Sequence, residues 1–283
     1  MRMVDHDTMT FRRLSHRFTV RCDDPVAATY VSRVLGRFSV DAEREGTSYE
    51  IVARGVSGPE SRYALMVDDE WMLGSDDQVL VLDELFARVN ANTMEATSGF
   101  VLVHSGAVVA RGGAGVLLPA ASGSGKTTLV AGLVRAGFGY LSDEAAVLDP
   151  VTGILHPYPV HLSLKAASRD RFPEARPDDA DLAFSGRAWH VDPDAIRPGA
   201  VASACAVGFV IAHRYEPGAA IRIEPLTPGE ACVELVRNLM LARRDTPRSL
   251  DLLARICRAS RSYRLTHGDL DEAVAAVGEL TVA

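Results

Sequence analysis

The chain has 283 residues, of which 47% are hydrophobic and 24% charged, a composition that is typical of folded globular proteins and excludes disordered and fibrous classes. Its formal net charge of −7, without a basic tail, argues against a general nucleic-acid binder. No apolar run approaches the ~20 residues that cross a bilayer, and residues 1–13 lack a secretion-signal pattern, so we expect a cytoplasmic protein with no membrane partner.

The first third of the sequence predicts a small α+β unit. Short stretches of alternating or apolar residues favour strands, and two segments have the spacing of amphipathic helices. We expect strands at 18–20, 49–53, 63–67 and 70–73, and helices at 27–35 and 78–91. No catalytic pattern occurs here, so residues 1–95 are interpreted as an N-terminal domain for packing or partner binding, with 90–98 as the junction.

The remainder, residues 96–283, predicts a second and larger domain in which short buried strands alternate with helices. Strands are expected at 100–104, 107–110, 116–118, 138–141, 201–212 and 263–265, and helices at 127–136, 228–241, 249–259 and after 269. Residues 166–200 are rich in Pro, Asp and Arg and show little periodicity. Such long connections are often lids or binding segments.

The strongest signal is the segment Pro119-Ala-Ala-Ser-Gly-Ser-Gly-Lys-Thr-Thr128, which lies between a predicted strand and a predicted helix. Triphosphate oxygens need several converging backbone N–H donors, which glycines make possible, and the helix directs its positive N-terminus at the anion. In this pattern Lys126 reaches the β- and γ-phosphates, and the Thr127 hydroxyl binds Mg²⁺. The sequence therefore predicts a site for ATP and Mg²⁺ with seven nucleotide-binding residues: Ser122, Gly123, Ser124, Gly125, Lys126, Thr127 and Thr128.

Two details of composition bear on this loop. The pattern Gly-x-x-x-x-Gly-Lys-[Ser/Thr] has a glycine where this chain has Ala120, and alanine tolerates a positive φ less well, so we expect a slightly altered loop entry. Of the 30 basic residues only Lys126 and Lys165 are lysines. Because lysine is rare in this chain, we expect each lysine to have a specific role.

Acidic and histidine side chains are predicted beside the loop. Asp143 and Glu144 follow the strand at 138–141, where a carboxylate can hold Mg²⁺ or accept a proton from an attacking hydroxyl, although a solvated turn has the same spacing. His104 ends a neighbouring predicted strand, where a lone histidine is more often structural. We take Asp143, Glu144 and His104 as catalytic candidates, and Thr127, Asp143 and Glu144 as candidate metal ligands.

Together these features resemble the kinase domain of HPr kinase/phosphorylase: His104 before a hairpin, a loop ending in Gly-Lys-Thr, and an acidic pair after the next strand. The sequence is still more similar to HPr-kinase-related proteins of peptide-modification gene clusters. The resemblance covers about residues 99–161, and the segment Tyr263-Arg-Leu-Thr-His-Gly-Asp-Leu270 also resembles that group. Residues 1–95 do not resemble the N-terminal domain of the true HPr kinases.

This resemblance implies an α/β fold with a P-loop kinase core of the HPr kinase/PEP-carboxykinase-like type, preceded by the small α+β domain. It implies that Asp143 accepts the proton of a serine hydroxyl and that His104 takes part in acid–base chemistry. Glu144, which stands where the family usually has a second Asp, would assist the metal. The resemblance is also compatible with a homo-oligomer.

Phosphoryl transfer needs cations near the γ-phosphate, because the transferred group carries spread negative charge. Arg214, just beyond the 201–212 strand, is the first candidate, and Lys165 is the second. A solvated surface charge is the simpler interpretation of each. Four arginines of the long loop could contact an acidic acceptor: Arg169, Arg171, Arg176 and Arg187.

The leading hypothesis is therefore a kinase that transfers the γ-phosphate of ATP to a hydroxyl, with serine of a peptide or protein, or a small molecule, as the expected acceptor. The alternative is an ATP-binding regulatory module whose nucleotide state controls a partner docked on residues 1–95. A motor-like ATPase fits less well, because the sequence shows no second acidic strand, sensor or arginine-finger arrangement.

Overall fold

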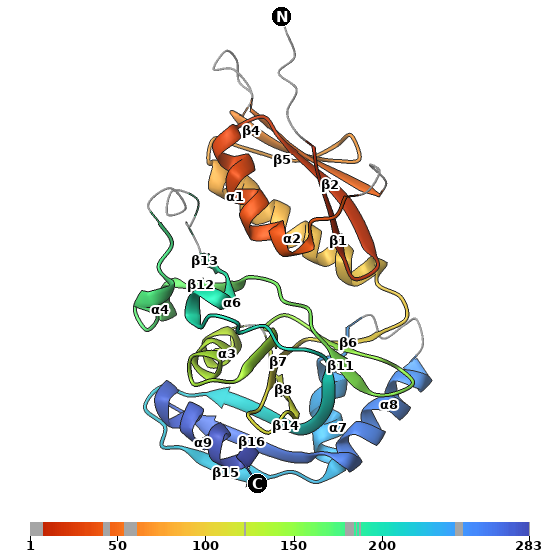
Figure 1. Cartoon of the computed structure of the whole chain (residues 1–283), viewed down its shortest axis with the longest axis vertical. Helices are drawn as coiled ribbons and strands as arrows, with labels where there is room; N and C mark the ends of the chain where they lie inside the picture. The colour runs from red at the N-terminus through yellow and green to blue at the C-terminus, as the bar shows by residue number, and fades with distance from the viewer. Residues whose placement is uncertain are drawn as a thin grey trace, which may run out of the picture. The chain divides into compact units, whose positions relative to one another are not determined.

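The computed structural model describes residues 8–41, 46–53, 61–121, 123–178, 184, 186, 188–240 and 246–282. The chain forms two compact units, Met1–Ser98 with Pro177–His190 and Gly99–Arg176 with Val191–Ala283 (Figure 1). The chain thus changes unit after Ser98, whereas the sequence predicts a boundary after residue 95 and a second domain that includes 177–190. Across the residues that are described, no helix has the length and apolarity to span a membrane.

The first unit is an α+β layer built on a five-stranded sheet, counted over the described residues, in the order β1-β2-β3-β4-β5. β2 and β3 are parallel and the other neighbours are antiparallel. The parallel pair needs a crossover, which α1 supplies. The elements are β1 Met9–Arg13, β2 His16–Cys22, α1 Pro25–Leu35, η1 Gly36–Phe38, β3 Thr47–Ala53, β4 Tyr63–Val67, β5 Glu70–Ser75 and α2 Gln78–Ala96.

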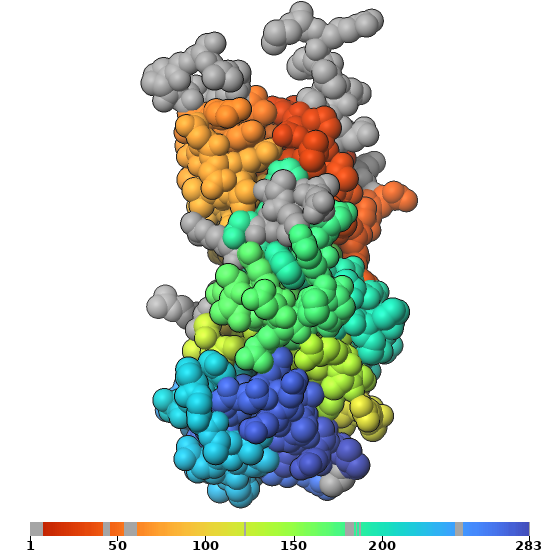
Figure 2. Space-filling model, turned by 90° about the vertical axis from the view of Figure 1, so that its left-hand side faces the viewer, coloured from red at the N-terminus to blue at the C-terminus, as the bar shows by residue number. Residues whose placement is uncertain are grey.

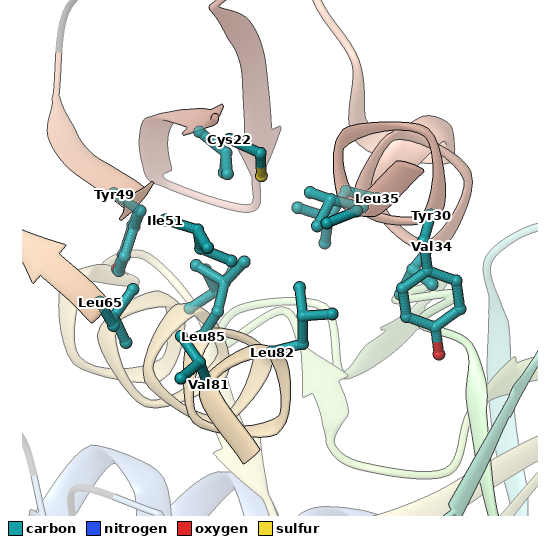
Figure 3. Packing of buried hydrophobic residues seen from close by; sticks show 14 of the residues in the cluster. Cys22, Tyr30, Val34, Leu35, Tyr49, Ile51, Leu65, Val81, Leu82 and Leu85 are labelled. Carbon is teal, nitrogen blue, oxygen red and sulfur yellow. The ribbon is translucent and has the colours of Figure 1, made fainter. Parts of the chain in front are cut away.

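The helices α1 and α2 of the first unit bury an apolar face on the sheet. Figure 3 shows Leu35 of α1 and Leu82 and Leu85 of α2 gathered around Ile51 of β3. α2 continues to Ala96, so most of the junction predicted at 90–98 is helical. The reason is that its buried face continues past the predicted end, with Thr93 and Met94 both buried.

His16 of β2 makes the stability of this unit pH-dependent. Its ring is buried, and its two nitrogens contact the hydroxyls of Thr93 (3.1 Å) and Thr47 (3.2 Å). Burial, together with the charge of Arg13, lowers the pKa of His16 to about 4. Between pH 6.5 and 4 the unfolded chain therefore binds a proton that the folded chain does not, so stability falls as the pH falls through this window.

We expect His16→Asn to remove this contribution, so that the free energy of unfolding of the wild type falls on the order of 3 kcal/mol more than that of the variant between pH 7 and pH 4. Urea unfolding followed by tryptophan fluorescence measures it, because both tryptophans, Trp71 and Trp189, belong to the first unit. His156→Asn, in the second unit, is the control. Parallel pH profiles for His16→Asn and the wild type would contradict the assignment.

The second unit contains a nine-stranded sheet within the described residues, with the path β6-β10-β11-β14-β8-β7-β9, β16 beside β14, and β15 beside β16. Its strands are β6 Val101–Val103, β7 Ser105–Val109, β8 Gly115–Pro119, β9 Gly139–Ser142, β10 Ala146–Leu148, β11 Ile154–His156, β14 Cys205–Tyr215, β15 Arg222–Pro225 and β16 Arg261–His267. Its longer helices are α3 Lys126–Arg135, α7 Pro228–Arg237, α8 Thr246–Ala259 and α9 Leu270–Val282.

The helices cover both faces of the central strands. α3 and α9 lie on one side of β8 and β14, and α7 and α8 lie on the other (Figure 1). Leu117 of β8 and Val210 of β14 pack with Leu235 of α7 and Leu253 of α8 in one buried cluster. The α/β class that the sequence predicts for this part is therefore confirmed.

Residues 166–200 are not structureless, which corrects the sequence interpretation. After β12 Leu162–Lys165 the described residues of this stretch form four short elements: α4 Ala166–Arg169, η2 Pro173–Ala175, β13 Ala188–Val191 and α6 Pro193–Ile196. Elements of three or four residues span about one helical turn or less, so they leave no periodicity for a sequence pattern to show.

One edge of the second sheet brings together segments that are far apart in the sequence. β8, β14 and β16 are parallel, so their last residues, Pro119, Tyr215 and His267, lie at the same edge. β7 is antiparallel to β8 and begins there, because Ser105 pairs with Pro119. β9 is antiparallel to β7 and ends there at Ser142. Along this edge the order is β16, β14, β8, β7 and β9.

Candidate functional site

A cavity of about 410 Å³ lies at this edge of the second unit. Residues 119–126, which connect β8 to α3, are here called the glycine loop. The cavity wall includes Ala121, Gly123 and Gly125 of this loop and the first turn of α3. The volume is within the range of ligand-binding cavities, roughly 300–1,000 Å³. Figure 2 shows a face of this unit on which the green segment of the 160s and 170s borders the blue C-terminal segment; both contribute residues to the cavity wall.

The glycine loop has the backbone geometry that its composition suggests. Gly123 and Gly125 have φ values of 82° and 86°, which side-chain-bearing residues rarely adopt. Ala120 does not adopt a positive φ and is buried, so this position does not require a glycine. The first helical hydrogen bond of α3 runs from Leu129 N to Gly125 O (3.0 Å), so the preceding amides of the turn have no partner within the helix. Ser122 lies outside the described residues.

Lys126 is the first residue of α3, lines the cavity and is only 7% exposed. Its Nζ lies 2.8 Å from Nε2 of His104. Nδ1 of His104 lies 3.0 Å from the carbonyl oxygen of Glu144, which can only accept, so Nδ1 carries the proton and Nε2 accepts from the ammonium. Burial lowers the pKa of Lys126, and burial together with the Lys126 charge lowers the pKa of His104.

Asp143 follows β9 and lines the same cavity, with 5% exposure. Its Oδ1 accepts a hydrogen bond from the Tyr140 hydroxyl (3.0 Å). Burial and the neighbouring Glu144 raise the pKa of Asp143 to about 6, although hydrogen bonding to the Thr127 and Tyr140 hydroxyls opposes this. Glu144 also lines the cavity, with Oε1 3.8 Å from Nδ1 of His104. The structure thus brings His104, Lys126, Thr127, Asp143 and Glu144 together.

The oxygen donors of this group fit Mg²⁺ in one particular way. Within the described part of the chain, no set of three or more His, Cys, Asp or Glu side chains is arranged to hold a metal by itself. Mg²⁺ is usually bound by one or two carboxylates together with substrate phosphates and water. Thr127, Asp143 and Glu144 therefore suit a Mg²⁺ that arrives with a phosphate ligand better than a resident structural metal.

Two basic side chains outside the glycine loop also line the cavity. Lys165 and Arg171 line it beside Ser163 and Ser168, so the only two lysines of the chain meet at one cavity. Among the described residues neither Lys165 nor Arg171 forms an ion pair. Arg169 and Arg176 do not line the cavity, and Arg187 lies outside the described residues. Of the basic residues considered as candidates beyond Lys126, the described structure thus brings Lys165 and Arg171 to the cavity.

Arg214 does not reach the cavity, which corrects its prediction as a γ-phosphate ligand. Its side chain is 74% exposed and pairs with Glu216 at 2.9 Å. Side chains alternate between the two faces of a strand. Ala212 of β14 lies in the cluster that packs with α7 and α8, so Arg214 lies on that face, whereas Tyr215 lines the cavity on the other.

The cavity residues that were not predicted as site residues include Tyr215, His267 and Leu270. They come from the ends of β14 and β16 and the start of α9. The available signal was the Thr-His-Gly-Asp-Leu segment at 266–270, which carries part of the resemblance to HPr-kinase-related proteins. No spacing rule connects residue 215 with residue 267, because their proximity arises from strand pairing.

Gly268, which follows β16, lies close to the backbone of Ala219, and this close approach leads to a stability prediction. A Cβ at this position would lie 2.6 Å from the backbone nitrogen and oxygen of Ala219. We expect Gly268→Ala to lower the free energy of unfolding by about 2–3 kcal/mol, because rigid backbone must move. Gly278→Ala in α9, where a Cβ meets nothing within 4 Å, should instead stabilise by up to ~1 kcal/mol. Thermal unfolding compares the two variants, and equal melting temperatures would contradict the expectation.

No protein-family model matches the chain, and no curated protein matches it. Among solved structures, the chain has a weak likeness to the Hpr(Ser) kinase/phosphatase from Coxiella burnetii, with a TM-score of 0.33 and 13% sequence identity. The alignment covers 64% of this chain and 97% of the other.

Proposed function

We propose that the second unit is a P-loop kinase that binds ATP with Mg²⁺ and transfers the γ-phosphate to a hydroxyl of a peptide, a protein or a small molecule. The observation that carries this proposal is the position of Asp143, a buried carboxylate on the wall of the same cavity as Lys126 and Thr127. The motif-based resemblance to HPr kinases points to the same activity. Simple anion capture at the glycine loop would not need that carboxylate.

In the proposed reaction the acceptor oxygen forms a bond to the γ-phosphorus while the bond from that phosphorus to the β–γ bridging oxygen breaks. ADP leaves with the electron pair, and the hydroxyl proton passes to the Asp143 carboxylate. The amides of the glycine loop and the Lys126 ammonium hold the phosphates. Lys165 and Arg171, which also line the cavity, would neutralise charge on the transferred group or on the acceptor.

Mg²⁺, held by Thr127, Asp143 or Glu144 together with the phosphates, would neutralise charge on the β- and γ-oxygens. Side chains of this protein position the reacting groups. His104 holds Lys126 beside the glycine loop through the contact between Nε2 and Nζ. Tyr140 orients Asp143 through their 3.0 Å hydrogen bond.

The test is a transfer assay with γ-labelled ATP and Mg²⁺ against a panel of hydroxyl compounds, including free serine, serine peptides and proteins with exposed serines. We expect ATP binding together with label on at least one acceptor. Arg214→Met is the matched control, because it removes a nearby cation outside the cavity and should leave both readouts unchanged.

Two outcomes would count against the kinase. A protein that binds ATP normally but labels no member of a broad panel supports the regulatory alternative, in which the nucleotide state controls a partner. A protein that binds neither ATP nor any other triphosphate contradicts both functions.

A further inference from the structure

We propose that Tyr215, His267 and Leu270 form the nucleoside end of the cavity, with Tyr215 stacking on the base and His267 accepting a hydrogen bond from the nucleoside. This assignment rests on the proposed function, because it presumes that a triphosphate occupies the glycine loop. It gives a role to the Thr-His-Gly-Asp-Leu segment at 266–270, which has no part in the proposed phosphoryl transfer.

His267 provides a directed hydrogen-bond acceptor. It lines the cavity and is 3% exposed. Nδ1 lies 3.2 Å from the carbonyl oxygen of Asp269, which can only accept, so Nδ1 carries the proton and Nε2 presents a lone pair. Nε2 is buried and has no hydrogen-bond partner in the described part of the chain. A buried acceptor without a partner is costly, so a ligand that donates an N–H or O–H there would be favoured.

Tyr215 provides the flat apolar surface. Its side chain lies against the glycine loop, since a Cβ on Gly125 would meet Cβ of Tyr215 at 3.5 Å. The residue is 44% exposed, and its ring centroid lies 5.7 Å from that of His267. With Leu270 this makes an aromatic and aliphatic surface with one acceptor, a combination that suits a base on its ribose better than a further phosphate.

The order of the strands places this group on the correct side of the loop. Along the sheet edge, β14 and β16 lie on one side of β8, and β7 and β9 lie on the other. His104 and Asp143 thus flank the glycine loop on the side opposite Tyr215 and His267. A triphosphate on the loop, with its γ-phosphate toward Asp143, extends its nucleoside end toward Tyr215 and His267.

Close backbone contacts and hydrogen bonds surround Tyr215, His267 and Leu270. Gly268 touches the backbone of 216–219 too closely for any side chain, and Glu216 N donates to His267 O at 2.9 Å. Asp269 accepts hydrogen bonds from the amides of Asp271 (2.8 Å) and Glu272 (3.1 Å) at the start of α9. Burial lowers the pKa of His267, so the imidazole is neutral and its acceptor is available at neutral pH. A preorganised surface of this kind favours binding of one ligand shape.

Calorimetric titration with ATP and with inorganic tripolyphosphate, both with Mg²⁺, tests the assignment. The wild type should bind ATP about ten-fold or more tighter than tripolyphosphate. Tyr215→Leu and His267→Phe should remove most of this ratio and leave the tripolyphosphate affinity unchanged. Tyr263→Leu and His156→Phe, which make the same changes elsewhere in the sheet, should keep the wild-type ratio. Tyr215 is partly exposed, so Tyr215→Leu is expected to fold even if His267→Phe does not.

Analogues distinguish the two possible donors. If the base amino group donates to His267, inosine triphosphate should bind the wild type as weakly as ATP binds His267→Phe. If a ribose hydroxyl donates, 2′- or 3′-deoxy-ATP should show that loss instead. Both outcomes support the nucleoside assignment.

Failure of the nucleoside assignment can be distinguished from failure of the proposed function. Variants that keep the wild-type ratio, or that lose ATP and tripolyphosphate affinity equally, overturn the nucleoside assignment and leave the proposed function standing. A wild-type protein that binds neither compound overturns both.

Discussion

Lys126→Met is expected to lower the affinity for ATP with Mg²⁺ by about 100-fold or more and to bring phosphoryl transfer below detection. Lys126 is buried at the start of α3 and is the cation nearest the amides of the glycine loop. Removing one member of a desolvated charge pair costs about 2–5 kcal/mol, which corresponds to a loss of this size. Methionine keeps the length of the side chain, so the change is mainly one of charge.

Isothermal titration with ATP measures the Lys126→Met effect, and a transfer assay follows the reaction. Lys165→Met is the matched control, because it changes the other lysine that lines the same cavity. It should lower ATP affinity much less than Lys126→Met, while reducing the transfer rate. Equal losses of ATP affinity in the two variants would mean that the cavity attracts anions only through its overall charge, and would remove the special role of Lys126.

Asp143→Asn is expected to reduce transfer by about 10²–10⁴-fold while ATP affinity changes only a few-fold. Asparagine has the same shape and its carbonyl oxygen can still accept from Tyr140, but it cannot take the proton of an attacking hydroxyl. The effect should therefore lie in kcat rather than in nucleotide binding. Asp149→Asn, in the turn between β10 and β11 and outside the cavity, is the control.

A Mg²⁺ titration separates two roles of Asp143. If Asp143 mainly holds the metal, the variant should need more Mg²⁺ for ATP binding, and excess Mg²⁺ should restore part of the rate. If it mainly accepts the proton, excess Mg²⁺ should restore nothing. An Asp143→Asn variant that supports transfer at the wild-type rate would show that neither role is correct.

The sequence predicted the longer elements well because their patterns repeat several times. The apolar run at 63–67 corresponds to β4, and the helical spacing at 127–136 to α3 within one residue at each end. Short strands were predicted unevenly, because three or four residues contain few repeats: β6 and β9 match the predictions at 100–104 and 138–141, whereas β10, β11 and β12 were missed. The end of α2 was missed because buried Thr93 does not read as part of an apolar face.

What the sequence by itself determined is the chemistry of contiguous residues. Gly123, Gly125, Lys126 and Thr127 lie next to one another along the chain, and the strand and helix around them follow from local pattern. Asp143 could also be anticipated, because it follows the next strand after α3, and the antiparallel pairing of β7 with β9 brings it to the same edge.

The tertiary structure alone decided which distant residues share that edge. Tyr215 and His267 lie beside the glycine loop because β14 pairs with both β8 and β16. Lys165 lines the cavity and Arg214 does not, because a strand sends neighbouring side chains to opposite faces and only packing decides which face meets the site. Strand order and the choice of face depend on burial summed over the whole sheet, and a local stretch of sequence does not contain that sum.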